Sequence, residues 1–354
     1  MKASARSRRT PRTRTSRKRH WTRLSDAELL HVRFCELDIS LQRSPLQPYL
    51  DQLNDELQRA GIEFRPHLWL SEEWFSPDGV PGIAVPFYLA HPRLRRLERR
   101  MMREVEGGNA NWLMRILRHE AGHALDTAYR LRHRRRWREV FGPASLPYPD
   151  SYRPRAGSRR FVQHLGAWYA QCHPTEDFAE TFAVWLRPNA HWRRVYRNWP
   201  ALEKLEYVDE LMSELRGTHP RVRQRRLVEP ISGDQRTLGE HYRDRLSRHA
   251  AGRARVVDTM LRRSFQVRSA GTPQHVRAAT YIRSLKTALR RNIANRLDVS
   301  EYLVHQVLRL ILHRCDVLRL QLRCAPRYAR SRVERLVLRI ARLHVDGSAG
   351  RHTL

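Results

Sequence analysis

The chain has 354 residues, an apolar fraction of 41% and a formal net charge of +32. This length and apolar content suit a globular protein with a full core and a second module. No run of about eighteen apolar residues could span a membrane, and the N-terminus lacks the apolar stretch of a secretory signal. We therefore expect a cytoplasmic protein. The cysteines lie far apart, which excludes a Cys-x-x-Cys zinc ribbon and favours reduced core thiols: Cys35, Cys172, Cys315 and Cys324.

Arginine dominates the basic residues. Of the 68 Lys and Arg residues, 64 are arginine, since the lysines are only Lys2, Lys18, Lys204 and Lys286. A large positive charge is typical of proteins that bind nucleic acid or another anionic surface, because neutralising phosphates drives such binding. Arginine in place of lysine can also follow from GC-rich coding. The overall charge therefore leaves a polyanionic partner open.

In chain order, the first segment is a basic arm. Residues 1–24 contain no acid, and a composition that repels itself and cannot bury apolar area predicts a disordered arm. Apolar residues then recur at helical spacing over residues 46–60. Residues 64–70 and 83–90 alternate or run apolar on either side of a turn signal, which predicts a small sheet. A charged helix over residues 94–106 follows.

The middle of the chain is predicted to be helical around one long connection. A helix over about residues 111–129 precedes residues 130–160, which show no sustained period and read as a surface loop of the kind that often carries function. Further helices are predicted over residues 161–170, 174–186 and 201–215. The pattern breaks at residues 228–234, which we take as a domain boundary. Residues 235–354 hold 26 Lys and Arg against 8 Asp and Glu and show helical apolar spacing, which predicts a basic helical module.

The first of these central helices carries a metal-binding pattern. The sequence His119-Glu120-Ala121-Gly122-His123 places two histidines four residues apart, so that both imidazoles project from one helix face. They can bind one metal ion while Glu120 faces a metal-bound water. The simplest alternative is a core helix with two hydrogen-bonded histidines and no metal.

Two histidines do not complete a catalytic zinc site, which usually takes three protein ligands and leaves a fourth position for water. Asp126 follows on the same helix, at the wrong height to close a tetrahedron, so we expect it to support the ligands rather than bind. His164 and His173 are isolated histidines. The candidates for the third ligand are Glu176, Glu180, Asp126, His164 and His173.

Glu176 and Glu180 are four residues apart and share a helix face. This spacing lets Glu176 reach the metal while Glu180, one turn on, accepts a hydrogen bond from a ligand histidine and fixes its tautomer. Acids in the first turn after Pro174 also stabilise a helix N-terminus through the helix dipole, so position alone does not separate a cap from a ligand.

Together with the histidine motif, one segment resembles the gluzincin metallopeptidases. It reads Tyr169-Ala170-Gln171-Cys172-His173-Pro174-Thr175-Glu176-Asp177-Phe178-Ala179-Glu180-Thr181-Phe182. It is similar to the catalytic region of the anthrax lethal-factor-like peptidases and to bacterial zinc-binding metallopeptidases. The resemblance covers the motif helix and about twenty residues around Glu176. It implies His119, His123 and Glu176 as zinc ligands, Glu120 as general base, Glu180 as a support and Tyr169 as stabiliser of the oxyanion. Tyr169 as an ordinary core tyrosine is the alternative.

These observations predict an α+β chain with three parts. Residues 1–24 form the arm, residues 25–232 a mostly helical, zincin-like metallopeptidase domain with a small sheet, and residues 235–354 an all-α basic module. The expected function is hydrolysis of peptide bonds in a peptide or protein substrate by a zinc-activated water. The alternative is a nucleic-acid-associated basic protein with a vestigial or accessory zinc site, in which the arm and the basic module contact nucleic acid or an anionic surface.

Overall fold

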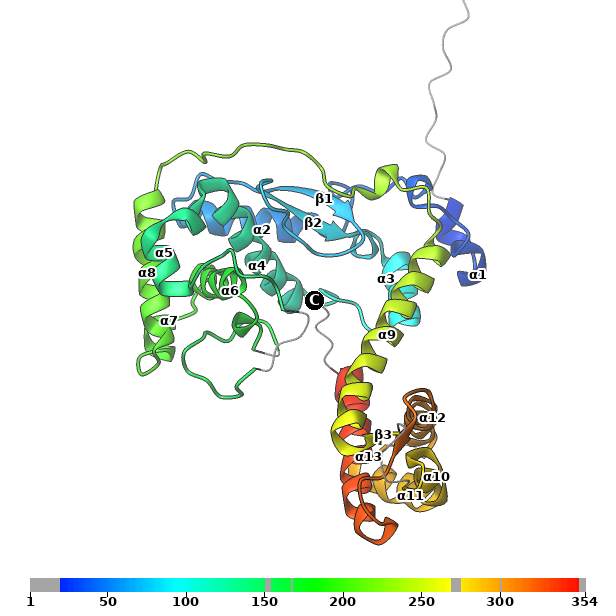
Figure 1. Cartoon of the computed structure of the whole chain (residues 1–354). Coiled ribbons are helices and arrows are strands. Elements are labelled where there is room, and N and C mark those ends of the chain that lie inside the picture. Colours follow the sequence, from blue (N-terminus) through cyan, green and yellow to red (C-terminus); the bar gives the residue numbers. More distant parts are fainter. Residues whose placement is uncertain (1–19, 150–153, 167, 269–274, 300, 350–354) are drawn as a thin grey trace, which may run out of the picture. The chain divides into compact units, whose positions relative to one another are not determined.

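The computed structural model describes residues 20–149, 154–166, 168–268, 275–299 and 301–349. The chain forms two compact units, Met1–His241 (unit 1) and Tyr242–Leu354 (unit 2), drawn in Figure 1. Most of the predicted arm, residues 1–19, lies outside the described residues. His20–Arg23 form a short 3-10 helix in which Trp21 is buried and donates a hydrogen bond from Nε1 to the carbonyl of Leu37 at 2.8 Å.

Unit 1 is mostly helical. Its elements are η1 (His20–Arg23), α1 (Asp26–Leu29), η2 (Phe34–Glu36), α2 (Gln47–Arg59), β1 (His67–Ser71), β2 (Gly82–Pro86), η3 (Phe87–Ala90), α3 (Pro92–Met102), α4 (Ala110–Tyr129), η4 (Leu131–His133), α5 (Arg135–Phe141), η5 (Tyr169–Gln171), α6 (Pro174–Leu186), α7 (Trp192–Val195), α8 (Ala201–Leu215) and η6 (Ile231–Gly233). The expectation of a mostly helical α+β chain with a small sheet is confirmed.

The sheet of unit 1 has two parallel strands. β1 pairs with β2 from His67 opposite Gly82 to Ser71 opposite Pro86. The predicted strand over residues 83–90 is too long, because the chain turns into η3 directly after Pro86. Every residue of β2 is buried, and the strand packs against α4. The sheet therefore packs, through β2, against the helix that carries the histidine motif.

The helices expected over residues 174–186 and 201–215 are found at those residues as α6 and α8. The prediction of a helix over residues 161–170 was wrong. Residues 161–166 are irregular, and the short η5 follows at Tyr169–Gln171. The apolar spacing there arises from side chains such as Val162, which is buried in a local cluster with Trp192. The segment is fixed by individual polar contacts with α4 and α6, described below, rather than by helical hydrogen bonds.

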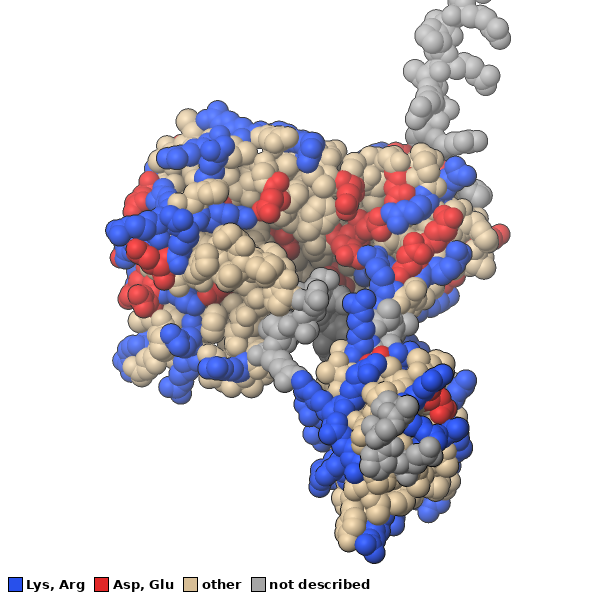
Figure 2. Space-filling model, viewed as in Figure 1, with Lys and Arg blue, Asp and Glu red and all other residues tan. Residues whose placement is uncertain are grey.

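Unit 2 is a helical bundle with a minimal sheet. Its elements are α9 (Leu238–Ser264, which begins at the end of unit 1), β3 (Gln266–Val267), α10 (Ala278–Ser284), α11 (Lys286–Leu297), α12 (Glu301–Val317), β4 (Leu320–Gln321) and α13 (Pro326–Ala349). Basic side chains predominate on its visible face, whereas acids and bases are mixed on unit 1 (Figure 2). The all-α prediction for this module was wrong in one detail, because β3 and β4 form an antiparallel ladder.

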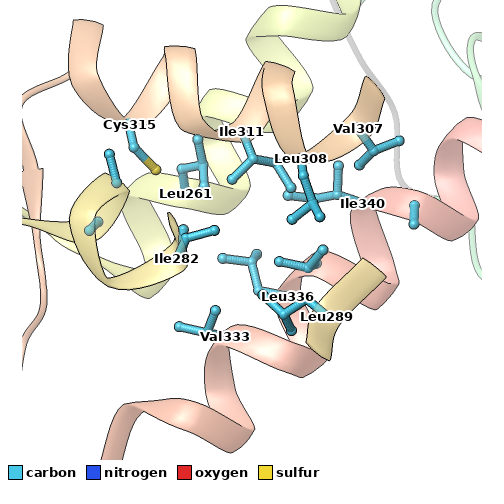
Figure 3. Close-up of a cluster of buried hydrophobic side chains, with 14 of the residues drawn as sticks. Leu261, Ile282, Leu289, Val307, Leu308, Ile311, Cys315, Val333, Leu336 and Ile340 are labelled. Carbon is cyan, nitrogen blue, oxygen red and sulfur yellow. The ribbon is translucent and has the colours of Figure 1, made fainter. Parts of the chain in front are cut away.

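The core of unit 2 is continuous and apolar. Its helices contribute buried residues to a single cluster, drawn in Figure 3, that includes Leu261, Ile282, Leu308, Ile311 and Ile340.

All four cysteines of the chain are free, and Cys172 and Cys315 are buried. Within the part of the chain that the structure describes, no helix is long and apolar enough to cross a membrane.

Candidate metal centre

Helix α4 carries the two motif histidines into the interior of unit 1. Asn109 caps the helix, since its side chain accepts a hydrogen bond from the backbone N–H of Trp112 at 2.9 Å. The apolar residues of α4 are packed in the core, and His119 and Glu120 are buried with them. The one-turn spacing brings the Nε2 atoms of His119 and His123 to 3.1 Å from each other. Two nitrogen ligand atoms thus converge on one point.

A glycine allows α6 to lie close against α4. A Cβ atom on Gly122 would lie 2.9 Å from the Cα atom of Ala179, which is closer than side-chain carbons normally approach. The rings of Phe178 and Phe182 on α6 are buried in the core as well. This close approach brings the acidic face of α6 opposite the histidines of α4.

Glu176 completes a triangle of three ligand atoms. Its Oε2 atom lies 3.0 Å from Nε2 of His119 and 3.2 Å from Nε2 of His123. A tetrahedral zinc site with bonds of about 2.0–2.1 Å has ligand-to-ligand edges of about 3.3 Å. The three edges are close to that value, and the three residues form a group able to hold a metal ion.

The electrostatics of the triangle favour a positive charge. Burial disfavours a charged imidazole, but hydrogen bonds to Glu176 and Glu180 outweigh it and raise the pKa of His119 well above its ordinary value. Burial likewise raises the pKa of Glu176, yet the two histidines outweigh it and hold the pKa of this carboxyl well below its usual range. An ionised carboxylate and two imidazole nitrogens facing one point fit a divalent cation.

Glu180 lies in hydrogen-bond contact with His119. Its Oε1 atom lies 3.0 Å from Nδ1 of His119, and its Oε2 atom accepts a hydrogen bond from the backbone N–H of Leu165 at 2.9 Å. Because Nδ1 donates to the carboxylate, the neutral form of the imidazole, which is the form that binds a metal, has its lone pair on Nε2, the atom in the triangle. Glu180 is fully buried, so water does not compete for this contact.

Glu120 and Tyr169 border the same site. Burial raises the pKa of Glu120, although His119 and His123 act against the rise. The ring centroid of Tyr169 lies 5.6 Å from that of His119. Burial and the charges of Glu176 and Glu120 raise the pKa of Tyr169, so its hydroxyl stays protonated and can donate a hydrogen bond.

Three further candidates from the sequence lie outside the triangle. Asp126 accepts hydrogen bonds from the backbone N–H of Arg132 at 2.7 Å and from its Nε at 2.6 Å. His164 contacts the carbonyl of Arg115 through Nε2 at 2.9 Å, and burial lowers its pKa to about 4. His173 is the N-cap of α6.

Tyr148 reaches the site although no pattern in the sequence singles it out. Its hydroxyl donates to Oε1 of Glu176 at 2.8 Å, the oxygen that faces away from the histidines. Its ring stacks on His173 with centroids 4.0 Å apart. His173 in turn contacts the carbonyl of Leu146 through Nε2 at 2.8 Å, which ties this loop to the start of α6. The only signal available was a tyrosine in a long, proline-containing connection.

A comparison with protein families agrees with this geometry. The model of a family described as "Putative zinc-binding metallo-peptidase" matches residues 89–193. That segment runs from η3 to α7 and contains both histidines, Glu120, Glu176 and Glu180, so the match supports a zinc metallopeptidase. It covers less than a third of the chain and none of unit 2. Neither a curated protein nor a solved structure matches the chain.

Proposed function

We propose that the chain is a zinc-dependent metallopeptidase whose metal ligands are His119, His123 and Glu176. The observation that carries the proposal is the triangle of two imidazole nitrogens and one carboxylate oxygen with edges of 3.0, 3.1 and 3.2 Å. Three protein ligands leave one position of a tetrahedron open, which is the arrangement of catalytic rather than structural zinc. The family match over residues 89–193 points to the same class.

The residues around the triangle can divide the work of hydrolysis. Bound zinc would supply a Lewis acid that activates water and polarises the scissile carbonyl. Glu120, next to His119 on α4, can take a proton from the attacking water and pass it to the leaving amine, and its raised pKa suits both roles. Tyr169 keeps its proton and can donate to the carbonyl oxygen as negative charge develops there.

One helix carries the two histidines, and a second helix packed against it carries Glu176 and Glu180. This arrangement supports a gluzincin type of site. We assign Glu180 the role of holding His119, on the basis of its 3.0 Å contact with Nδ1. Tyr169 is assigned to the oxyanion from its place beside His119 and from the resemblance to lethal-factor-like peptidases. A structural zinc is normally closed by Cys and His ligands, and none of the four cysteines joins the triangle.

Removal and return of the metal test the proposal. The purified chain should contain about one zinc per molecule, lose peptide hydrolysis when treated with a chelator, and regain it with added zinc. His119→Ala should lose both the zinc and the activity. His133→Ala, at an exposed histidine of η4, is the matched control and should keep both. A chain that binds no zinc, or that hydrolyses peptides equally well without it, would exclude the proposed function.

A further inference from the structure

The positive charge of the chain is distributed very unevenly. Residues 25–241 hold 33 Lys and Arg against 29 Asp and Glu, a net charge of +4. Residues 242–354, which make up unit 2, hold 25 against 7, a net charge of +18. Unit 2 therefore carries more than half of the total of +32 in less than a third of the length.

Coding bias does not explain this contrast. A GC-rich gene exchanges lysine for arginine, which leaves the net charge unchanged and acts along the whole chain. About half of the difference between the units lies in their acids, which occur about once in seven or eight residues over 25–241 and about once in sixteen over 242–354, and the other half in a higher density of basic residues over 242–354. A unit with fewer acids and more bases than the rest of the chain carries a positive field of its own, of the kind that attracts polyanions.

Helix α13 arranges part of this charge in a row. Arg332, Arg335, Arg339 and Arg342 are spaced by three, four and three residues, and all four are exposed. This spacing places them on one helix face along about 15 Å of axis. Among the described residues, none of the four forms an ion pair with an acid. We call these four residues the α13 arginine row.

Three acids among the described residues of unit 2 pair with arginines outside this row. Asp258 accepts two hydrogen bonds from Arg314, Glu301 pairs with Arg290 at 2.7 Å, and Glu334 lies 3.6 Å from Arg296. Glu334 is on α13, but its position in the helical turn places it well away from the face of the row. Within the described part of unit 2, these pairs leave the four guanidinium groups of the row without an acid bound to them.

The opposite face of α13 anchors the helix. Val333, Leu336, Val337 and Ile340 are buried, and Figure 3 shows Val333, Leu336 and Ile340 directed into the core of unit 2. Because this apolar face is buried in the core of unit 2, it is not available to insert into a lipid surface. The arginine row is therefore held at the surface of a packed helix.

We propose that the α13 arginine row is a binding surface for the phosphate backbone of duplex DNA. Guanidinium groups match phosphate oxygens with paired hydrogen bonds. A duplex carries about one charge per 1.7 Å of its axis, so a stretch as long as the row holds about nine charges over both strands. A protein that binds single strands stacks bases on exposed aromatic rings. On α13 only Tyr328 could serve in this way, and the guanidinium of Arg327 already lies 4.8 Å from its ring centroid.

Fluorescence anisotropy with a labelled duplex of mixed sequence tests the proposal on the full chain. The wild-type chain should bind, and its affinity should fall steeply as salt rises from about 50 to about 200 mM. Changing the four arginines of the row to glutamine should weaken binding about 10- to 100-fold and lower the slope of log K against log salt by about 3 to 4. Changing the same four to lysine should keep most of the affinity.

A charge-matched control separates the row from the overall charge of the chain. Arg96, Arg99, Arg194 and Arg197 are exposed in unit 1, and changing them to glutamine removes the same four charges. This variant should bind the duplex nearly as well as the wild type. The proposal is overturned if the wild type does not bind, if the row variant binds normally, or if both variants lose affinity equally. Tighter binding of phosphatidylserine vesicles or of single-stranded DNA than of the duplex would also overturn it.

Discussion

Nδ1 of His119 on α4 lies 3.0 Å from Oε1 of Glu180 on α6. The other oxygen of Glu180 accepts a hydrogen bond from the backbone N–H of Leu165, so both carboxylate oxygens face donors. This one side chain therefore sets the tautomer of a proposed zinc ligand and fixes the irregular segment before η5. The two histidines and Glu176 depend on such contacts for their precise placement.

Replacing Glu180 by glutamine should weaken zinc binding. A glutamine side chain has one oxygen and one NH2 group, whereas His119 Nδ1 and the backbone N–H of Leu165 both donate to this position. In either orientation of the amide, the NH2 group faces one of these donors and that contact is lost. We expect zinc affinity to fall about 10- to 100-fold, measured by competition with a chromophoric chelator. Glu203→Gln, at an exposed acid in the first turn of α8, is the control and should bind zinc normally. Unchanged affinity in Glu180→Gln would show that Glu180 does not orient His119.

Tyr148→Phe should also reduce zinc affinity, by a smaller factor. The variant removes the hydroxyl that donates to Oε1 of Glu176 and keeps the ring that stacks on His173. A hydrogen bond to a charged group contributes about 1.5–3 kcal/mol, so we expect a loss of about tenfold or somewhat more. The matched control is Tyr328→Phe, at an exposed tyrosine of unit 2, which should have no effect. Equal affinities in the two variants would contradict a role for Tyr148.

Gly122→Ala should destabilise unit 1. The added Cβ would lie 2.9 Å from the backbone of Ala179 and would push α4 and α6 apart, at a cost of about 1–3 kcal/mol. Gly233→Ala is the control, because a Cβ there meets nothing within 4 Å. All nine tryptophans lie in unit 1, so tryptophan fluorescence during urea denaturation reports on this unit alone. Identical midpoints for the two variants would contradict the close packing of the helices.

Glu72 should make the stability of unit 1 depend on acidity. The carboxylate of Glu72 forms a hydrogen bond with His241 at 2.7 Å and an ion pair with Arg236, which also binds Asp234. These contacts lower the pKa of Glu72 to about 2, although burial acts in the opposite direction. Because the folded pKa is below the unfolded value of 4.5, the stabilisation is complete above about pH 4.5 and is lost as the pH falls toward 2.

Glu72→Gln tests this linkage directly. At neutral pH the variant should be less stable than the wild type by about 2 kcal/mol, and the difference should shrink as the pH falls below about 4.5. Urea denaturation followed by tryptophan fluorescence at several pH values measures the difference. A gap that stays constant down to about pH 3 would mean that the carboxylate of Glu72 titrates normally in the folded chain.

The sequence revealed the parts of the site that depend on helical spacing. His119 and His123, and again Glu176 and Glu180, are pairs one turn apart, and a helix turns such pairs to one face whatever surrounds it. The role of Tyr148 depends on the path of a loop without periodicity, 28 residues before Glu176 along the chain. His164 and His173 could not be excluded beforehand either, because only the fold shows that they bind the carbonyls of Arg115 and Leu146.

The fold was likewise predictable where the periodicity was sustained. The bounds of α6 and α8 follow from apolar spacing that extends over three or more turns. Residues 161–166 have similar apolar content but are held by His164 and the backbone of Leu165, contacts made with residues far away in the sequence. The strand that ends at Pro86 was predicted too long, because residues 87–90 are as apolar as the strand itself.

Glu120 as the base of a zinc peptidase is tested by comparing the zinc-loaded wild type with zinc-loaded Glu120→Gln. Each protein is incubated with a mixed peptide library, and mass spectrometry measures the cleavage. The variant keeps His119, His123 and Glu176 and should retain zinc, but it lacks the carboxylate that accepts the proton. We predict that the wild type cleaves the library and that Glu120→Gln, with equal zinc content, is slower by about 100-fold or more. Equal cleavage by the two proteins, or no cleavage by the zinc-loaded wild type, would contradict the assignment of a zinc peptidase with Glu120 as its base.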